Sequence, residues 1–167
     1  MATELEDLKI LQMAEGIADA VWKRVVQWDE FAKDVVGKQM ARATDSIGAN
    51  IAESYGRFNY GEKLQFLYYS RGSLFEAKYW LNRAIARELM PVEEVKTYAA
   101  RLSDVARQLN TFANSLKSQR KDSKHQSKSV REPNAEYITG DWLDDSASLF
   151  TNPELDWLTT VPEISSL

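Results

Sequence analysis

Apolar residues recur at steps of three and four over most of the first 118 residues of this chain. This spacing places them on one face of an α-helix, and the pattern is interrupted near Trp28, Gly56 and Pro91. No alternation of apolar and polar residues, which would indicate a β-strand, competes with it before residue 135. We therefore expect an all-α fold, with residues 1–118 forming an antiparallel up-down-up-down four-helix bundle.

The pattern predicts helices at about residues 3–27, 34–55, 59–89 and 91–116. Thr3 and Glu6 fit a capping box at the start of the first helix. An irregular connector is expected between the first two helices. Gly56 suits a left-handed stop after the second helix, and Pro91 suits the first turn of the fourth.

The net charge of −4 is unevenly distributed along the chain. Lysine and arginine dominate residues 117–131, whereas residues 132–167 carry eight acidic side chains and no basic one. These shifts divide the chain into a nearly neutral bundle (1–118), a basic linker (119–134) and an acidic, aromatic tail (135–167). We expect the tail to be mostly irregular.

The tail contains two copies of Asp-Trp-Leu, at residues 141–143 and 156–158. Tryptophan is costly to leave in water, so an acidic stretch with two of them is expected to dock on a surface. That surface is either a partner protein or the chain's own bundle, and composition does not separate the two. The expected docking residues are Trp142, Leu143, Phe150, Trp157 and Leu158.

A narrow polar stripe of alternating charge runs beside the apolar face of the second helix. Half-buried polar groups without partners cost about 1–3 kcal/mol each, so the stripe is predicted to face neighbouring helices. Glu53 would accept hydrogen bonds from Arg57, Arg71 or Ser73. With its partners on the third helix, the expected structural polar seam comprises Arg42, Ser46, Asn50, Glu53, Arg57, Arg71, Ser73 and Glu76.

The third helix carries two basic residues, Arg71 and Lys78, within its apolar stripe. Several large aromatic residues also lie off the primary stripes of their helices. They form either a second row of the core or a surface that packs on another subunit, and together they favour an oligomer. They are Trp22, Phe66, Tyr69, Tyr79 and Trp80.

One set of short motifs connects these features: Arg42, then Ser-Ile-Gly-Ala-Asn-Ile-Ala-Glu at 46–53, Gly-Arg at 56–57, Phe-Leu at 66–67, and Arg-Gly-Ser-Leu at 71–74 with Glu76. In these motifs the chain resembles the four-helix-bundle family of 23S rRNA intervening-sequence proteins, which includes the accessory variability determinant proteins of diversity-generating retroelements. The resemblance implies a bundle that assembles into a ring of five and belongs to proteins that are not known as enzymes. For the retroelement branch it also implies a reverse transcriptase partner and nucleic-acid binding through a basic surface.

Two functions follow as hypotheses. The first is a non-catalytic oligomeric scaffold or adaptor, a homopentamer by resemblance, whose tail docks on a partner or on its own ring. The alternative is an RNA-binding accessory protein, in which the acidic tail would mimic nucleic acid and regulate binding. Near-neutral charge over the bundle favours the first hypothesis. The candidate nucleic-acid contacts are Arg42, Arg57, Lys63, Arg71, Lys78, Lys121, Lys124 and Lys128.

Composition argues against catalysis, metals and membranes. The chain has no cysteine and a single histidine, His125, so a zinc site or a histidine-based triad is not expected. The Glu-x-x-His spacing of di-iron bundles and a phosphate-binding glycine loop are also missing from the sequence. No apolar run is long enough for a membrane span, and no basic leader precedes the first helix. We expect a cytoplasmic protein without cofactor.

Overall fold

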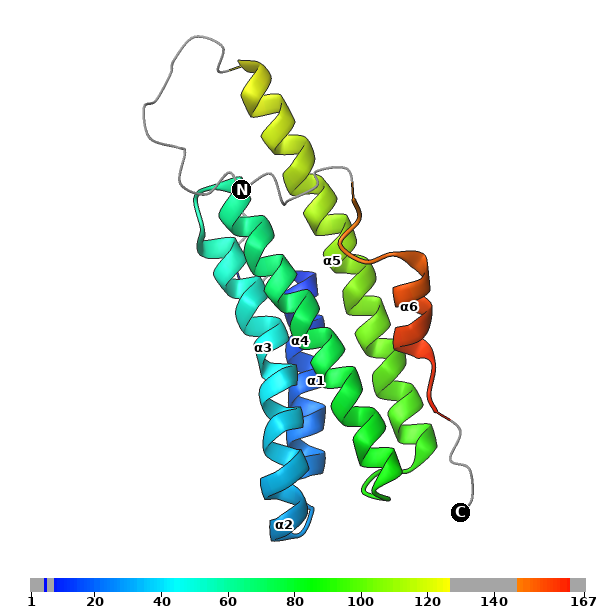
Figure 1. Ribbon diagram of the computed structural model, residues 1–167. Coiled ribbons are helices and arrows are strands. Elements are labelled where there is room, and N and C mark those ends of the chain that lie inside the picture. The colour runs from blue at the N-terminus through cyan, green and yellow to red at the C-terminus, as the bar shows by residue number, and fades with distance from the viewer. Residues whose placement is uncertain (1–4, 6–7, 127–146, 163–167) are drawn as a thin grey trace.

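The computed structural model describes residues 5, 8–126 and 147–162, and every regular element in them is helical. These helices form a bundle (Figure 1). In chain order the elements are α1 (Lys9–Val25), α2 (Glu30–Ala32), the π-helical turn η2 (Lys33–Gly37), α3 (Lys38–Gly56), α4 (Tyr60–Ala86), α5 (Val92–Gln126) and α6 (Asn152–Thr159).

The core lies between α1, α3, α4 and α5. Helix α3 packs against α1 and α4, and α5 packs against α4 and α1, while the short α6 lies along α5 on the outside (Figure 1). The residues spaced at three and four are the buried ones, among them Ile17, Ile47, Leu74 and Leu102. They belong to one contiguous apolar core, which confirms the predicted helical bundle.

The segment between α1 and α3 is helical and not the irregular connector that the sequence predicts. The Asp29 carboxylate accepts a hydrogen bond from the backbone N–H of Ala32 at 2.9 Å and so starts α2, which continues through η2 into α3. Gly37 lets η2 approach α1, because a Cβ at this position would lie 2.5 Å from Cγ1 of Val25. The prediction is wrong because the cap and the π turn together keep the chain helical.

Helix α3 ends at Gly56, as predicted, but without a left-handed residue. Among the described residues no glycine has a positive φ, and Arg57 is extended at φ −83°. The left-handed residue of the described chain is Glu88, at φ 57°, in the turn between α4 and α5. The capping box expected from Thr3 and Glu6 lies outside the described residues.

Two features of the C-terminal third differ from the expected linker and irregular tail. Helix α5 runs to Gln126 and therefore includes residues 119–126, the first part of the segment predicted as a linker. Lysine, arginine and glutamine are good helix formers, so no residue type ends the helix at 118. The tail contains α6, whose start carries Pro153 and the pair Thr151 and Glu154.

Candidate functional site

Residues 147–162, which we call the C-terminal strap, contact both α4 and α5. The surface of these two helices that the strap covers is called the groove, and α6 lies on its α5 side (Figure 1). The ring of Phe75 on α4 stacks on the rings of Phe150, at 5.8 Å between centroids, and Trp157, at 5.3 Å. The strap is therefore fixed by aromatic and aliphatic contacts with the bundle. Its buried apolar residues are Leu149, Phe150, Leu155 and Leu158.

The two basic residues in the α4 stripe face this strap. Arg71 donates from Nε to the carbonyl oxygen of Leu149 at 2.8 Å, and its guanidinium pairs with the Glu154 carboxylate. Lys78 is 0 % exposed, and its ammonium donates to the carbonyl oxygen of Thr160 at 2.5 Å. The strap thus supplies acceptors for two cations that would otherwise lie in an apolar stripe.

Polar side chains of α5 complete the groove. Asn110 donates to the carbonyl oxygen of Phe150 at 2.9 Å and accepts from the N–H of the same residue at 2.6 Å. Lys117 donates to the carbonyl oxygen of Ala147 at 2.5 Å, and the hydroxyl of Ser103 lies 3.5 Å from a further strap carbonyl. Most of the polar contacts between groove and strap are therefore made to the strap main chain.

Sequence reasoning did not identify the three α5 residues, although a signal is present. Ser103, Asn110 and Lys117 are polar residues spaced by seven, and Arg71 and Lys78 on α4 are also seven apart. A step of seven keeps side chains on one helical face, so each helix has a polar row within its apolar stripe. Two such rows on neighbouring helices predict a polar segment that covers both.

Burial perturbs two titratable groups in this region. Desolvation lowers the pKa of the Lys78 ammonium to about 8, from its ordinary 10.5. Partial burial by itself would raise the pKa of Glu154, but the hydrogen bond from the Thr151 N–H and the charge of Arg71 outweigh it, and the pKa lies below the ordinary 4.5. The protonation of both groups is therefore coupled to docking of the strap.

The predicted polar seam lies on the surface of the chain and is not enclosed by its own helices. Glu53 is exposed and pairs with Arg57, one of the three partners that the sequence suggested, and not with Arg71 or Ser73. The pairing has a simple geometric reason: Arg57 is four residues away along the chain, while Arg71 points to the opposite side of α4, towards the strap. Asn50 makes a marginal contact of 3.5 Å with Ser73.

Two shorter hydrogen bonds between α3 and α4 come from serines outside the predicted seam. Ser54 donates to the carbonyl oxygen of Lys63 at 2.8 Å, and Ser70 donates to that of Ile47 at 3.0 Å. Both serines are 0 % exposed, so each bond satisfies a buried hydroxyl. Of the remaining seam residues, Arg42 and Glu76 are exposed, and the hydroxyl of Ser46 is partly buried on α3.

Aromatic side chains lie beside the seam on α4. The guanidinium of Arg57 sits 4.7 Å from the centroid of the Phe66 ring, and Phe66 meets Tyr69 edge to face at 5.5 Å. Tyr69 is 49 % exposed, and Trp80 is partly exposed. We call this surface the α3–α4 face; it comprises Arg42, Asn50, Glu53, Arg57, Phe66, Tyr69, Ser73 and Trp80.

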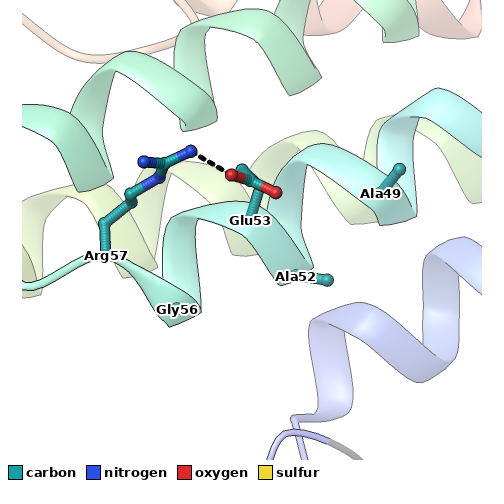
Figure 2. A pocket seen from close by; sticks show the side chains of 5 residues that line it. All are labelled: Ala49, Ala52, Glu53, Gly56 and Arg57. Atoms are coloured by element: carbon teal, nitrogen blue, oxygen red, sulfur yellow. Dashed lines mark hydrogen bonds and ion pairs between the residues drawn. The ribbon is translucent and has the colours of Figure 1, made fainter.

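A shallow depression of about 360 Å³ opens at the edge of this face. Figure 2 shows the residues that line it, at the C-terminal end of α3, with a dashed line for the ion pair between Arg57 and Glu53 and with Ala49 and Ala52 nearby. The carboxylate and the guanidinium are engaged with each other, and small residues form the rest of the lining. Its lining holds neither a pair of acids nor a nucleophile beside a base.

The basic residues proposed for nucleic acid do not gather on one surface. Arg71 and Lys78 lie beneath the strap, Arg57 pairs with Glu53, and Arg42 is exposed on α3. Lys63 is half-buried near the start of α4, and Lys121 is exposed near the end of α5. The side chains of Lys124 and Lys128 lie outside the described residues, as do Trp142 and Leu143 of the tail.

Two properties of the described residues concern metal ions and membranes. Within them, no group of three or more histidine, cysteine, aspartate or glutamate side chains is placed to hold a metal ion. None of the helices in that part of the chain combines the length and apolar character needed to cross a bilayer.

Most of the bundle matches a known protein family. The family model described as 23S rRNA-intervening sequence protein matches residues 6–111, from the region of α1 into α5. The chain belongs to this family. No curated protein matches the chain. The α3–α4 face lies within the matched segment of this family member, whereas the strap and the last turns of α5 lie beyond it.

Proposed function

We propose that this family member is a non-catalytic scaffold or adaptor whose antiparallel up-down-up-down four-helix bundle assembles through the α3–α4 face into a ring of five. The observation that carries the proposal is the exposure of aromatic residues next to paired charges on that face, over a core that is already filled. Aromatic residues and arginine are enriched at protein interfaces, where their burial contributes most of the binding energy.

The polar groups of the face would set the register between subunits. Glu53 and Arg57 form an ion pair in solvent that contributes little to the stability of one chain. Enclosed between subunits, the same pair would need well-matched partners and would penalise other arrangements. The depression beside Ala49 and Ala52 would receive a side chain of the neighbour.

A ring of five requires two different patches on each subunit, because its contacts are heterologous. A second group of exposed apolar side chains lies at the α1–α2 end of the bundle and includes Trp22, which is 60 % exposed, Val26 and Phe31. Trp22 and Val26 are one turn apart on the same side of the helix. This group is the proposed complement of the α3–α4 face.

Size-exclusion chromatography with light scattering on Tyr69→Glu and Trp80→Glu variants tests the proposal. Each charge would be placed in the assembled interface, so the mass should fall towards that of one chain. Thr97→Glu, on the exposed side of α5, is the matched control and should leave the mass unchanged. Equal masses for all the variants and the unmodified protein would remove the α3–α4 face as the interface.

Nucleic-acid binding is the second candidate, favoured by the basic final turns of α5 and by the rRNA association in the name of the family. Phosphate contacts release counterions, so RNA affinity should fall steeply with added salt. If the strap also masks basic groups such as Arg71, deleting residues 132–167 should raise RNA affinity. Absence of RNA binding at low salt in both forms would eliminate this candidate.

The proposed roles in the cell follow from the same reasoning. A scaffold without cofactor or catalytic residues would act in the cytoplasm by bringing partners together, either a protein that contacts the bundle or a reverse transcriptase of the kind implied by the resemblance. A pull-down with a candidate reverse transcriptase, using Tyr69→Glu and the unmodified protein side by side, separates binding to the assembly from binding to a single chain.

A further inference from the structure

The groove between α4 and α5 recognises the strap mainly through its main chain. Arg71, Lys78, Asn110 and Lys117 each donate a hydrogen bond to a strap carbonyl oxygen. Every peptide presents such carbonyls whatever its side chains are, so these donors select the path of a segment more than its sequence. The groove would therefore accept other segments that follow the same path.

Side-chain selection by the groove is confined to a few positions. The buried strap residues Leu149, Phe150, Leu155 and Leu158 fill apolar pockets, and Glu154 both caps α6 and pairs with Arg71. Trp157 stacks on Phe75 and lies beside Lys78, whereas the other intervening side chains of α6 face solvent. The required pattern is therefore two apolar residues, then a residue with a capping hydroxyl, and a glutamate three residues after that cap. A leucine follows the glutamate directly, and an aromatic residue and a second leucine come two and three positions after the first leucine. The solvent-facing strap positions are Asn152, Pro153, Asp156 and Thr159.

Charge in the groove matches an acidic helical segment better than it matches RNA. Of the acidic strap residues in the described range, Glu154 pairs with a groove cation, while Asp156 is exposed. The other donors of the groove reach neutral carbonyl oxygens. Phosphate binding relies on several accessible cations along a backbone. Here the Lys78 ammonium lies at the bottom of an apolar site, beside the Trp157 ring at 5.7 Å.

From these contacts we infer that the α4–α5 groove is a docking site for a short acidic amphipathic helix of a partner protein, and that the strap is its built-in competitor. A partner helix with the same apolar and capping pattern displaces the strap and takes over the hydrogen bonds of Arg71, Lys78 and Asn110. This site is on the opposite side of α4 from the α3–α4 face, and it requires no assembly of the chain.

Competition by the strap sets the expected affinity. A tethered ligand competes as if it were present at roughly millimolar concentration, so a free helix binds the unmodified chain at least about tenfold more weakly than a chain whose strap is released. Release is achieved in the full chain by combining Phe150→Ala and Leu158→Ala, which removes two buried side chains of the strap and leaves the groove intact.

Fluorescence anisotropy with two labelled peptides tests the inference. One peptide has the sequence of residues 147–162, and the other combines the solvent-facing changes N152A, P153A, D156E and T159A. Both should bind the strap-released chain with affinities within about threefold of each other, since these side chains make no groove contact, and both should bind the unmodified chain at least about tenfold more weakly. If the peptide with the native sequence binds and the substituted peptide does not, the groove is specific for the strap sequence, and the inference is overturned.

A matched pair of asparagines on α5 locates the site. In the strap-released chain, Asn110→Ala should weaken peptide binding by about tenfold, because it removes two hydrogen bonds to the peptide main chain. Asn114→Ala, one turn along on the exposed side, should leave affinity unchanged. Equal affinities for the two variants, or displacement of the peptide by polyuridine RNA at equal concentration, would contradict a groove for peptide helices.

The strap-released variant must first be shown to be helical by circular dichroism. If it is not, the unmodified protein with a protease site inserted between residues 127 and 146 replaces it. After cleavage, exchange of the released strap for the labelled peptide supports the inference. Retention of the original strap through many hours of excess peptide overturns it.

Discussion

Helix α4 presents similar side chains on two sides, yet the two sides have different partners. Towards α5 it carries Arg71, Phe75 and Lys78, and the strap covers all of them. Towards α3 and solvent it carries Phe66 and Tyr69, which the described chain leaves partly or largely exposed. Aromatic and basic residues on the surface of this bundle thus indicate a site where another segment packs. The side of α4 that the strap covers shows the interactions of such a site.

The ion pairs on the two sides differ in the same way. Glu53 in the last turn of α3 pairs with Arg57 directly after that helix, and both side chains are 40 % or more exposed. Arg71 and Glu154 are distant in sequence, each side chain is 30 % exposed, and Arg71 also binds the Leu149 carbonyl. Solvent screens the first ion pair, whereas the second joins two segments of the chain. Replacing the arginine by alanine should therefore reduce stability more in the second pair than in the first.

The largest effect is expected from Phe150→Ala. This ring is 1 % exposed, and its removal should weaken docking of the strap by about 3–5 kcal/mol. Hydrogen exchange of the strap amides measures the change. Phe58→Ala is the control on the other side of the comparison, since Phe58 is 98 % exposed and its loss should change stability by less than about 0.5 kcal/mol. Equal effects would mean that the strap is not docked in solution.

Arg71→Ala and Arg57→Ala compare the two ion pairs directly. Loss of Arg71 leaves Glu154 and a strap carbonyl without their donor, so urea unfolding should report a loss of about 2–3 kcal/mol. Loss of Arg57 should cost about 0.5 kcal/mol or less, as for other exposed pairs one turn apart. A larger loss of stability for Arg57→Ala than for Arg71→Ala would mean that Arg57 lies on the covered side and Arg71 on the exposed side.

Lys78 gives the covered side a pH dependence. Its pKa is about 8 in the folded chain and 10.5 without burial, so between these values the unfolded chain binds more protons and stability rises with pH. Relative to Lys78→Met, the free energy of unfolding of the unmodified protein should increase by about 1 kcal/mol from pH 7 to pH 9. Parallel pH profiles of the two proteins would show that Lys78 is solvated.

Glu53→Ala should have the smallest effect on stability, about 0.5 kcal/mol or less, because it breaks an exposed pair. Its expected consequence is weaker assembly through the α3–α4 face, seen as a lower mass by sedimentation. Glu93→Ala, which breaks the exposed pair with Lys96 on α5, is the matched control. If the two variants assemble equally well, the pair on α3 does not set the register.

Much of the fold could be predicted because helical periodicity reflects burial directly. Ile47, Ile51 and Leu74 follow the stripe and are buried. The connector before α3 could not be predicted from periodicity, since a π turn shifts the phase of the helix by one residue. Helix α6 was missed because eight residues are too few for a stripe, although Thr151, Pro153 and Glu154 mark its start.

The two sides of α4 were separable from the sequence only in part. Arg71 was assigned to the same polar seam as Glu53 because the second and third predicted helices were expected to be neighbours. The spacing of residues in the sequence shows which side chains share a side of a helix, but not which neighbouring segment that side contacts. The strap supplies the partner of Arg71 from 83 positions along the chain. Contacts between segments so distant depend on the folded path of the chain, which composition does not contain.

Native mass spectrometry of the full-length protein tests assembly through the α3–α4 face most directly. Assembly into a ring predicts a species of five chains of 19.1 kDa each, which Tyr69→Glu converts into single chains. A mass of 19.1 kDa for the unmodified protein at micromolar concentration would contradict it, because the exposed aromatic residues of the α3–α4 face would then have no partner of their own kind.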